Sequence, residues 1–529
     1  MIFFAIHQCL SERGKHMSKK FYVTTPIYYP SGQLHLGHAY TTTLADIMKR
    51  YKQRQGYEVF FLTGSDEHGQ KIAKKAAEFK MSPKAYLDER VDQFKDLWKK
   101  LHIDYDYFIR TTDENHVQAV QKIFEALETK GLIYKGHYEG LYCVSCEEFL
   151  TPEQIDETGC CKISQNKPEK LTEETYFLKV SAFQDFIEDL LKTDFLKPDY
   201  RRSEMLKNFV EPGLKDLSIT RTSFDWGIPI IGDEKHVVYV WLDALSNYLT
   251  ALGYFQTDKT QFEKFWAEDT EILQFVGKEI IRFHSIYWPV LLKSLDLRLP
   301  NTLLAHGWIM NKNTKMSKSL GNVIDPLVLI NEFGADALRF YLAHDLPTER
   351  DGNFSGPLFI ESFNVNLANN VGNLISRVNK MITQYSNGKL LNLKNVDLEM
   401  IDLGHQTIDK YQKLMDNYQI SEAINVVLDL GVALNKYIEN EEPWVLDRDG
   451  YQEELEKVLV TLQRNLIIMT YLLEPVLVET TPEMFKQLGA DKIVWDPEKL
   501  KTFSHLHLDK LPERKILFKR IKDHQFLEN

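Results

Sequence analysis

The chain has 529 residues, of which 43% are hydrophobic and 26% are charged, and its formal net charge is −12. This length predicts roughly three to four structural units, each with enough apolar residues for a buried core. No apolar run approaches the ~18 residues of a membrane span, and the acidic balance argues against indiscriminate binding to nucleic acid. We therefore expect a cytoplasmic globular protein without a membrane partner.

The first hundred residues carry the pattern of a strand, a turn and a helix. We expect residues 1–16 to be a disordered or upstream-start extension, since Met17 opens a more natural beginning. Residues 21–23 have strand composition, residues 30–32 are a turn signal, and apolar residues recur with helical spacing from 40 to 51. Gly37 and His38 then lie at a helix N-terminus, where free N–H groups and the helix dipole favour a phosphate.

His35-Leu36-Gly37-His38 therefore predicts one half of a nucleotide site. His35 and His38 are spaced so that both can donate to phosphate oxygens, and Gly37 removes a side chain where a nucleotide approaches. A second buried strand, residues 59–63, ends at Asp66. The carboxyl edge of such a sheet is where α/β proteins bind ligands.

The middle of the chain interrupts this sheet and then resumes it. We expect residues 17–116 and 226–325 to form one catalytic domain, with 117–225 as an insertion. Residues 272–277 and 302–305 have the composition of further buried strands.

The second half of the nucleotide site follows these strands. Lys315-Met316-Ser317-Lys318-Ser319 lies in a polar loop that can close over the β- and γ-phosphates. Its two lysines would neutralise the charge that builds as a nucleophile attacks the α-phosphorus. Either signature alone is modest support. Together, in this order, they predict one ATP site.

The insertion holds four of the five cysteines in a pattern that resembles a zinc knuckle. Cys143 and Cys146 form a C-x2-C pair, and Cys160 and Cys161 follow. The completing position falls on Ile163 or Ser164, neither of which is a good zinc ligand. A metal-free knuckle is favoured over a zinc ion held by three thiolates and an outside donor such as His137.

Beyond residue 325 the pattern is helical. Residues 326–363 are expected to link the catalytic domain to a helical domain over residues 364–529. Two apolar stripes predict an antiparallel bundle, with the polypeptide's last residues folding back through Ile516, Leu517 and Phe518. The stripes are Val427, Leu430, Leu434, Tyr437 and Ile438, and Leu455, Leu459, Leu462, Leu466, Met469 and Leu473.

From about residue 20 to 475 the chain resembles class I aminoacyl-tRNA synthetases, and specifically the methionyl-tRNA synthetases. The resemblance adds four blocks to the two signatures: Val23-Thr24-Thr25-Pro26-Ile27-Tyr28-Tyr29, Thr63-Gly64-Ser65-Asp66-Glu67-His68-Gly69, Val240-Trp241-Leu242-Asp243-Ala244 and Phe283-His284-Ser285-Ile286-Tyr287-Trp288. It implies an α/β fold with a Rossmann-like nucleotide-binding catalytic domain, split by a connective insertion, and an α-helical anticodon-binding bundle.

The resemblance also implies residue roles. His35, His38, Lys315 and Lys318 would be catalytic, and Gly37 and Ser317 would join them in binding ATP. Methionine would be held by Ile27, Tyr29, Asp66, Trp241, Tyr248, Phe283, His284 and Trp288, with Asp66 on the ammonium group. The anticodon would be read by Asn369, Asn373, Arg377 and Trp444, the first three of which share one helix face. Cys143, Cys146, Cys160 and Cys161 would be the candidate metal ligands, as an incomplete zinc knuckle.

The implied partners are L-methionine, ATP with Mg²⁺ and tRNA(Met), and we expect a monomer because no C-terminal dimerising domain is apparent. Three alternatives stay open at this stage. They are a class I ligase for another amino acid, a small-molecule adenylyl or cytidylyl transferase, and a synthetase-like RNA-binding relative without activity.

Overall fold

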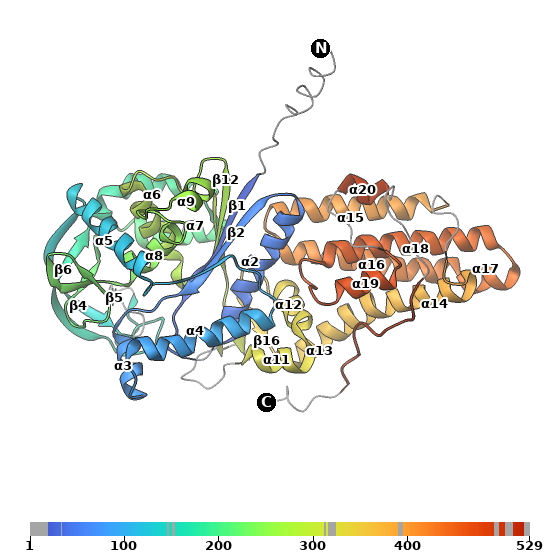
Figure 1. Cartoon of the computed structure of the whole chain (residues 1–529), viewed down its shortest axis with the longest axis horizontal. Coiled ribbons are helices and arrows are strands. Elements are labelled where there is room, and N and C mark those ends of the chain that lie inside the picture. The colour runs from blue at the N-terminus through green and yellow to red at the C-terminus, as the bar shows by residue number, and fades with distance from the viewer. Residues whose placement is uncertain are drawn as a thin grey trace, which may run out of the picture.

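The computed structural model describes residues 19–32, 34–144, 148–150, 154–311, 314–315, 324–389, 395–490, 497–502 and 511–522. Figure 1 shows two bodies. The central sheet and the insertion form one body, and the red and orange helices of the C-terminal half form the other. Helices α2 and α12 lie where the two bodies meet (Figure 1).

A six-stranded parallel sheet is the core of the first body. Its order is β3 (Tyr107–Arg110), β2 (Glu58–Ser65), β1 (Lys20–Tyr28), β12 (Thr270–Gly277), β13 (Thr302–His306) and β7 (Leu196–Lys197). The strands expected near residues 21, 59, 272 and 302 are all confirmed. The chain moves outward from β1 to β3 and returns at β12, so a topological switch point lies between β1 and β12, where such sheets bind ligands.

Helices cover the sheet and build up the rest of the catalytic body. Helix α2 (Leu36–Arg54) follows β1 and buries the predicted stripe of Leu44, Ile47, Met48 and Tyr51. The other helices here are α3 (Gln70–Glu78), α4 (Pro83–Lys100), α5 (Glu114–Thr129), α8 (Val240–Thr250), α9 (Thr260–Phe265) and α10 (Trp288–Ser294).

The insertion is mostly antiparallel sheet. Strands β5 (Glu148–Leu150), β4 (Ile133–Cys143), β6 (Glu169–Leu178) and β8 (Leu217–Ser218) form one sheet, and β10 (Ile228–Ile230), β11 (Asp233–Val238) and β9 (Thr220–Arg221) form another. Strands β10 and β11 come after residue 225, but β11 pairs with β9 and β10 pairs with β11, so both belong with the insertion. Two short helices, α6 (Gln184–Leu190) and α7 (Asp199–Met205), accompany them. Strand β7 also lies within residues 117–225, yet it pairs with β13, so the insertion returns to the catalytic sheet once.

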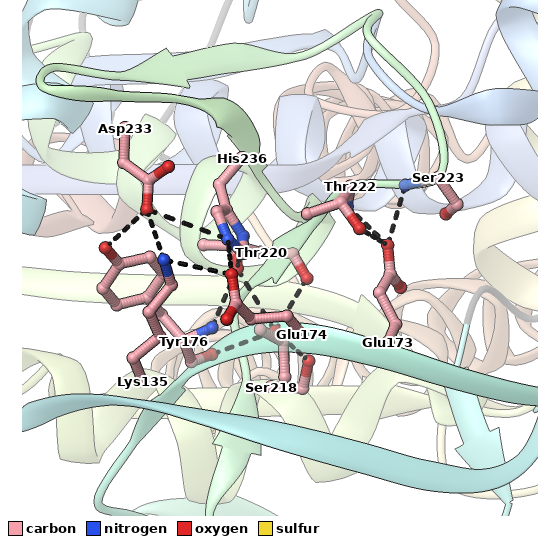
Figure 2. Close-up of polar contacts among 11 residues, drawn as sticks. Lys135, Glu173, Glu174, Tyr176, Ser218, Thr220, Thr222, Ser223, Asp233 and His236 are labelled. Atoms are coloured by element: carbon pink, nitrogen blue, oxygen red, sulfur yellow. Dashed lines mark hydrogen bonds and ion pairs between the residues drawn. The ribbon is translucent and has the colours of Figure 1, made fainter.

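Figure 2 shows a polar network that holds the two sheets of the insertion together. The Lys135 ammonium lies 2.7 Å from Asp233 and 3.1 Å from Glu174. His236 is fully buried; its Nδ1 lies 3.1 Å from Thr220 Oγ1, and its Nε2 lies 3.3 Å from Glu174 Oε1. These contacts tie β11 to β6 and β4 and give the insertion its own structural support.

The second body is a helical bundle, as predicted. After α11 (Pro326–Phe333), α12 (Ala335–His344) and α13 (Gly356–Ser362), a π-helical stretch, Phe363–Asn373, runs into α14 (Leu374–Ser386). Helices α15 (Leu398–Asp416), α16 (Ile420–Glu441), α17 (Pro443–Asp449), α18 (Gln452–Leu473), α19 (Thr481–Gln487) and α20 (Pro497–Thr502) follow. Both predicted stripes are buried, on α16 and α18. Phe518 packs on the core as expected, but Ile516 is 72% exposed, so the expectation for that residue was wrong.

A buried ion pair joins the two bodies. Arg339 of α12 and Asp46 of α2 are both fully buried, 2.7 Å apart. Arg339 also donates to the carbonyl oxygens of Leu101, Pro475 and Val476. Apolar residues from α2, α12 and the bundle belong to one continuous core. Among the residues that the structure describes, no helix is long and apolar enough to cross a membrane.

Candidate active site

A cavity of about 380 Å³ opens at the carboxyl edge of the sheet, at the switch point. Its walls come from the segments that follow β1, β12 and β13 and from the first turn of α2. The lining residues are Pro26, Ile27, Tyr28, Tyr29, His35, Gly37, His38, Thr41, Gly277, Glu279, Ile280, His306, Gly307, Trp308 and Ile309. The structure therefore brings the predicted ATP residues of the first signature together with two of the predicted methionine residues.

The two histidines of the first signature cap helix α2 reciprocally. His35 is the N-cap residue, and its Nδ1 accepts the N–H of Gly37 at 3.1 Å. Nδ1 of His38 accepts the N–H of His35 at 3.1 Å. Because each Nδ1 is an acceptor, these hydrogen bonds assign the proton of each ring to Nε2. Both imidazoles are thus fixed as Nε2–H donors at a helix N-terminus, which suits an anion.

Gly37 is required by this cap. A Cβ at residue 37 would lie 2.9 Å from Cε1 and 3.0 Å from Nδ1 of His35. The ring of His35 could not keep its hydrogen bond to the Gly37 N–H beside such an atom. We expect a glycine at this position because a nucleotide must approach closely. The structure adds a second reason, which is that Gly37 leaves room for the His35 ring that caps α2.

The opposite wall of the cavity holds polar residues that sequence reasoning missed. Trp308 donates through Nε1 to Glu279 at 2.8 Å, and its ring lies 3.8 Å from the Lys278 ammonium. Asp351 accepts from Lys278 at 2.7 Å and from the N–H of Trp308 at 2.9 Å. The sequence did contain an indication for Lys278 and Glu279, because they directly follow the predicted strand that ends at Gly277 and so lie at the carboxyl edge of the sheet.

The lysine signature is described only in part. Lys315 belongs to the two-residue strand β15 (Thr314–Lys315), which pairs with β14 (Ile309–Asn311) directly after the cavity wall. Ser317 and Lys318 lie outside the described residues. Their roles stay predictions.

Four of the other predicted methionine residues form two ring pairs and are not among the residues that line the cavity. The rings of Trp241 and Phe283 stack with their centroids 3.4 Å apart and their planes within 7°. The ring centroids of Tyr248 and Trp288 are 5.4 Å apart. Flat apolar faces of this kind suit a flexible, polarisable thioether side chain.

His284 is buried against Tyr248 as a neutral ring. Its Nδ1 donates to the carbonyl oxygen of Ile280 at 3.0 Å, so its Nε2 accepts the hydroxyl of Tyr248 at 2.8 Å. Burial lowers the pKa of His284 to about 4, although the hydrogen bond to Ile280 opposes this shift. Burial likewise raises the pKa of Tyr248.

Asp66 lies directly after β2, in a segment held on several sides. Its side chain is buried, and its N–H donates to the carbonyl oxygen of Tyr28 at 3.0 Å. The Tyr29 hydroxyl donates to the carbonyl oxygen of His68 at 3.0 Å. Tyr29 and Asp66 thus belong to adjoining segments at the carboxyl ends of the neighbouring strands β1 and β2.

The four residues predicted to read the anticodon form two contacting pairs on the helical body. Asn373 donates to the side-chain oxygen of Asn369 at 3.1 Å, and the guanidinium carbon of Arg377 lies 5.9 Å from the centre of the Trp444 ring. Trp444 is 42% exposed, and both asparagines are exposed. An exposed indole beside an arginine can stack on an unpaired base.

The cysteines do not form a closed metal site in the described part of the chain. Cys143, Cys160 and Cys161 are thiols rather than disulfide partners, and Cys146 lies outside the described residues. The sulfur of Cys143 lies 3.1 Å from the hydroxyl of Ser164, at one of the positions where a fourth ligand was sought. The described residues contain no group of three or more His, Cys, Asp or Glu that could hold a metal ion.

A parallel sheet whose switch-point cavity carries a histidine-capped helix, followed by a helical bundle, defines a class I aminoacyl-tRNA synthetase. Comparisons agree. Residues 21–161 and 157–379 match the family described as tRNA synthetases class I (M), and residues 392–528 match the anticodon binding domain of methionyl tRNA ligase. The chain belongs to the methionyl-tRNA synthetase family.

Individual relatives support this assignment. The methionine–tRNA ligase of Clostridium acetobutylicum is 47% identical over 512 residues, which cover 95% of this chain and 78% of the relative. That of Ureaplasma parvum is 45% identical, over 95% of this chain and 98% of the relative. A structure of Mycobacterium tuberculosis methionyl-tRNA synthetase in complex with methionyl-adenylate has a TM-score of 0.87 and 33% identity, covering 95% of this chain and all of that one. The predicted family, fold class and methionine–tRNA ligase activity are confirmed.

Proposed function

We propose that the cavity at the switch point joins L-methionine to ATP and that the helical body selects tRNA(Met). The observation that carries this proposal is the cavity's lining. Ile27 and Tyr29, from the predicted methionine set, face the same space as His35 and His38. The complex of the Mycobacterium tuberculosis relative with methionyl-adenylate supports the same pairing of ligands.

In the first step the methionine carboxylate attacks the α-phosphorus of ATP. An oxygen–phosphorus bond forms to give methionyl-adenylate, and the bond to pyrophosphate breaks. Nε2–H groups of His35 and His38 would donate to phosphate oxygens, while Lys315 and Lys318 would neutralise the charge on the leaving pyrophosphate. Because the protein forms no covalent bond, its contribution is positioning and charge stabilisation.

In the second step the terminal ribose hydroxyl of tRNA attacks the methionyl carbonyl, and AMP leaves. The acceptor end would reach the cavity while Asn369, Asn373, Arg377 and Trp444 hold the anticodon on the other body. Recognition of single-stranded loops by stacking and hydrogen bonds to base edges is the usual mode for RNA.

Mg²⁺ is proposed as a companion of the ATP phosphates, where it would offset their negative charge. For zinc the fit is poor, because the described residues contain no group of three or more His, Cys, Asp or Glu that could hold a metal ion, and Cys143 contacts the hydroxyl of Ser164, which is not a good zinc ligand. We propose a metal-free knuckle. Elemental analysis of the purified chain should give far less than one zinc per chain, and stoichiometric zinc that a chelator removes with loss of folding would overturn this.

ATP–pyrophosphate exchange without tRNA, with each of the twenty amino acids, tests the proposed first step. Methionine alone, or methionine far above the rest, should drive exchange. Lys318→Ala should slow exchange by about two to three orders of magnitude while leaving methionine affinity nearly intact. A matched control is Lys192→Ala, an exposed lysine in the insertion. Exchange driven by another amino acid would refute the proposed pocket.

Assembly and compartment are proposals as well. We infer a monomer in the cytoplasm, and the thiols of Cys143, Cys160 and Cys161 fit a reducing compartment. Light scattering of the purified chain tests whether it is a monomer. Fractionation of cells that produce the chain tests whether it is cytoplasmic.

A further inference from the structure

A buried carboxylate on helix α8 has no part in the chemistry proposed above. Asp243, on helix α8, is fully buried. Its Oδ2 lies 2.7 Å from Nδ1 of His68, and its Oδ1 lies 2.7 Å from Nε2 of His116. Both oxygens are therefore engaged by imidazoles, one from the loop after β2 and one from α5.

The three elements that meet at Asp243 include both parts of the proposed methionine site. His68 comes two residues after Asp66, the proposed ammonium ligand. Helix α8 carries Trp241 and Tyr248, from the proposed side-chain pocket. The His68–Asp243 contact thus connects the segment that binds the polar end of methionine to the helix that binds its apolar end.

The rest of the Asp66–His68 segment is attached to other elements. The N–H of Glu67 donates to the Thr111 hydroxyl at 2.9 Å, and the Trp226 indole donates to the Glu67 carbonyl oxygen at 2.7 Å. These contacts fix the segment to the loop that follows β3 and to the insertion. The His68 side chain supplies its tie to α8.

The contacts of Asp243 with His68 and His116 favour an ionised carboxylate held in one position. Burial alone would raise the pKa of Asp243, but the charge of His68 and hydrogen bonds from His116 and His68 outweigh it and lower that pKa to about 2. His116 is itself held, since its Nδ1 lies 2.7 Å from the hydroxyl of Thr250 at the end of α8. A carboxylate buried without such donors would be costly.

We infer that Asp243 is a positioning residue for methionine activation: through His68 it sets the distance between Asp66 and the aromatic wall on α8. This inference rests on the proposed function of the cavity. Loosening the contact should weaken methionine binding selectively, because the ATP wall formed by His35, Gly37 and His38 lies on α2 and does not depend on it.

The first test is Asp243→Asn. In the wild type, each carboxylate oxygen of Asp243 accepts a hydrogen bond from one imidazole N–H. The amide of the variant keeps one accepting oxygen but places an N–H donor against the other imidazole, so one hydrogen bond is lost unless that ring changes tautomer. We expect KM for methionine in ATP–pyrophosphate exchange to rise about ten- to a hundredfold, as for a site held about 1 Å too loosely. KM for ATP should stay within about twofold of the wild type.

A pair of variants at His68 separates positioning from general damage. The amide nitrogen of His68→Asn can occupy the place of Nδ1 and still donate to Asp243, whereas His68→Ala cannot. His68→Asn should therefore restore most of the methionine affinity that His68→Ala loses. The control is His236→Ala, which removes an equally buried histidine from the network of Figure 2 and should leave the KM for methionine unchanged.

The outcomes are distinct. Methionine-dependent exchange by the wild-type chain decides the proposed function, and the variants decide the inference. The inference would be overturned if Asp243→Asn changed the KM for methionine and the KM for ATP equally, or changed neither. It would also be overturned if His68→Asn and His68→Ala lost methionine affinity equally. If Asp243→Asn fails to fold, the His68 pair gives the answer.

Discussion

The guanidinium of Arg377 lies against the indole of Trp444, with 5.9 Å between the guanidinium carbon and the ring centre. The two residues come from different helices, α14 and α17, and meet on the surface of the helical body. An arginine held in this way supports the ring from one side and leaves a cation beside it for a phosphate or a base edge.

Trp444→Ala should damage tRNA charging and spare the first step. Loss of a stacking platform costs about 1–3 kcal/mol per base, so kcat/KM for tRNA(Met) should fall by about five- to 150-fold. ATP–pyrophosphate exchange without tRNA should match the wild type, since the residue lies on the other body. Equal damage to both reactions would mean that the variant is misfolded.

Gly37→Ala should impair ATP use far more than it destabilises the fold. The added Cβ would displace the His35 ring, which lies 2.9 Å away, and with it the cap and the Nε2–H donor. We expect exchange to slow by about a hundredfold, as for a misplaced catalytic group. Methionine affinity, measured by calorimetry without ATP, should not change. The thermal unfolding temperature should fall by no more than a few degrees, because loss of the His35 cap costs about 0.5–2 kcal/mol and the higher helix propensity of alanine offsets part of that loss.

His284 should make stability depend on pH in a definite direction. Its folded-state pKa of about 4 lies below the unfolded value of 6.5, so the unfolded chain binds a proton first as pH falls. The contribution of His284 to the free energy of unfolding is fully present above the unfolded pKa and is lost as pH falls from there toward about 4.

Between about pH 7.5 and about pH 5 this should cost about 2 kcal/mol in the free energy of unfolding. His284→Gln, which does not titrate, should show a correspondingly smaller loss when both chains are unfolded in urea at the two pH values. Asp243, with its pKa near 2, does not contribute in this window. An identical pH response in both chains would refute the burial of a neutral ring.

Arg339→Ala should be strongly destabilising. It removes the α12 partner of the buried Asp46, which among the described residues keeps only Arg50 as an ion-pair partner at 2.7 Å, and it removes donors from three carbonyl groups, at a cost of about 3–5 kcal/mol. The matched control is Arg448→Ala, which breaks an exposed arginine–aspartate pair and should cost at most about 1 kcal/mol. Similar losses in the two variants, measured by denaturant unfolding, would contradict the role assigned to the buried pair.

Much of the fold could be predicted because its elements have strong local periods. The helical stripes on α16 and α18 and the buried strands β1, β12 and β13 follow directly from apolar spacing. Strand β7 could not be predicted, since two residues have no period and only the neighbouring β13 makes them a strand. The π-helical stretch before Leu374 was likewise not visible, because no residue type in the sequence marks i→i+5 hydrogen bonding.

The site was predicted as a set of residues but not as a set of contacts. The first signature indicated a phosphate site, yet which nitrogen of His35 or His38 faces a ligand depends on backbone hydrogen bonds. His68 and Asp243 are 175 residues apart, so nothing in their local sequence indicates that they meet. Such pairs are decided by the packing of whole elements.

The ion pair of Asp46 and Arg339 has a practical meaning for dissecting this enzyme. Helix α2 presents its first turn to the cavity and buries its middle against α12, so a shortened chain that ended after the sheet would expose a charged pocket and the apolar surface around it. The catalytic half is therefore a poor candidate for separate expression. Any engineered version of the anticodon-binding half is better made by exchanging its exposed residues than by cutting the polypeptide at the junction.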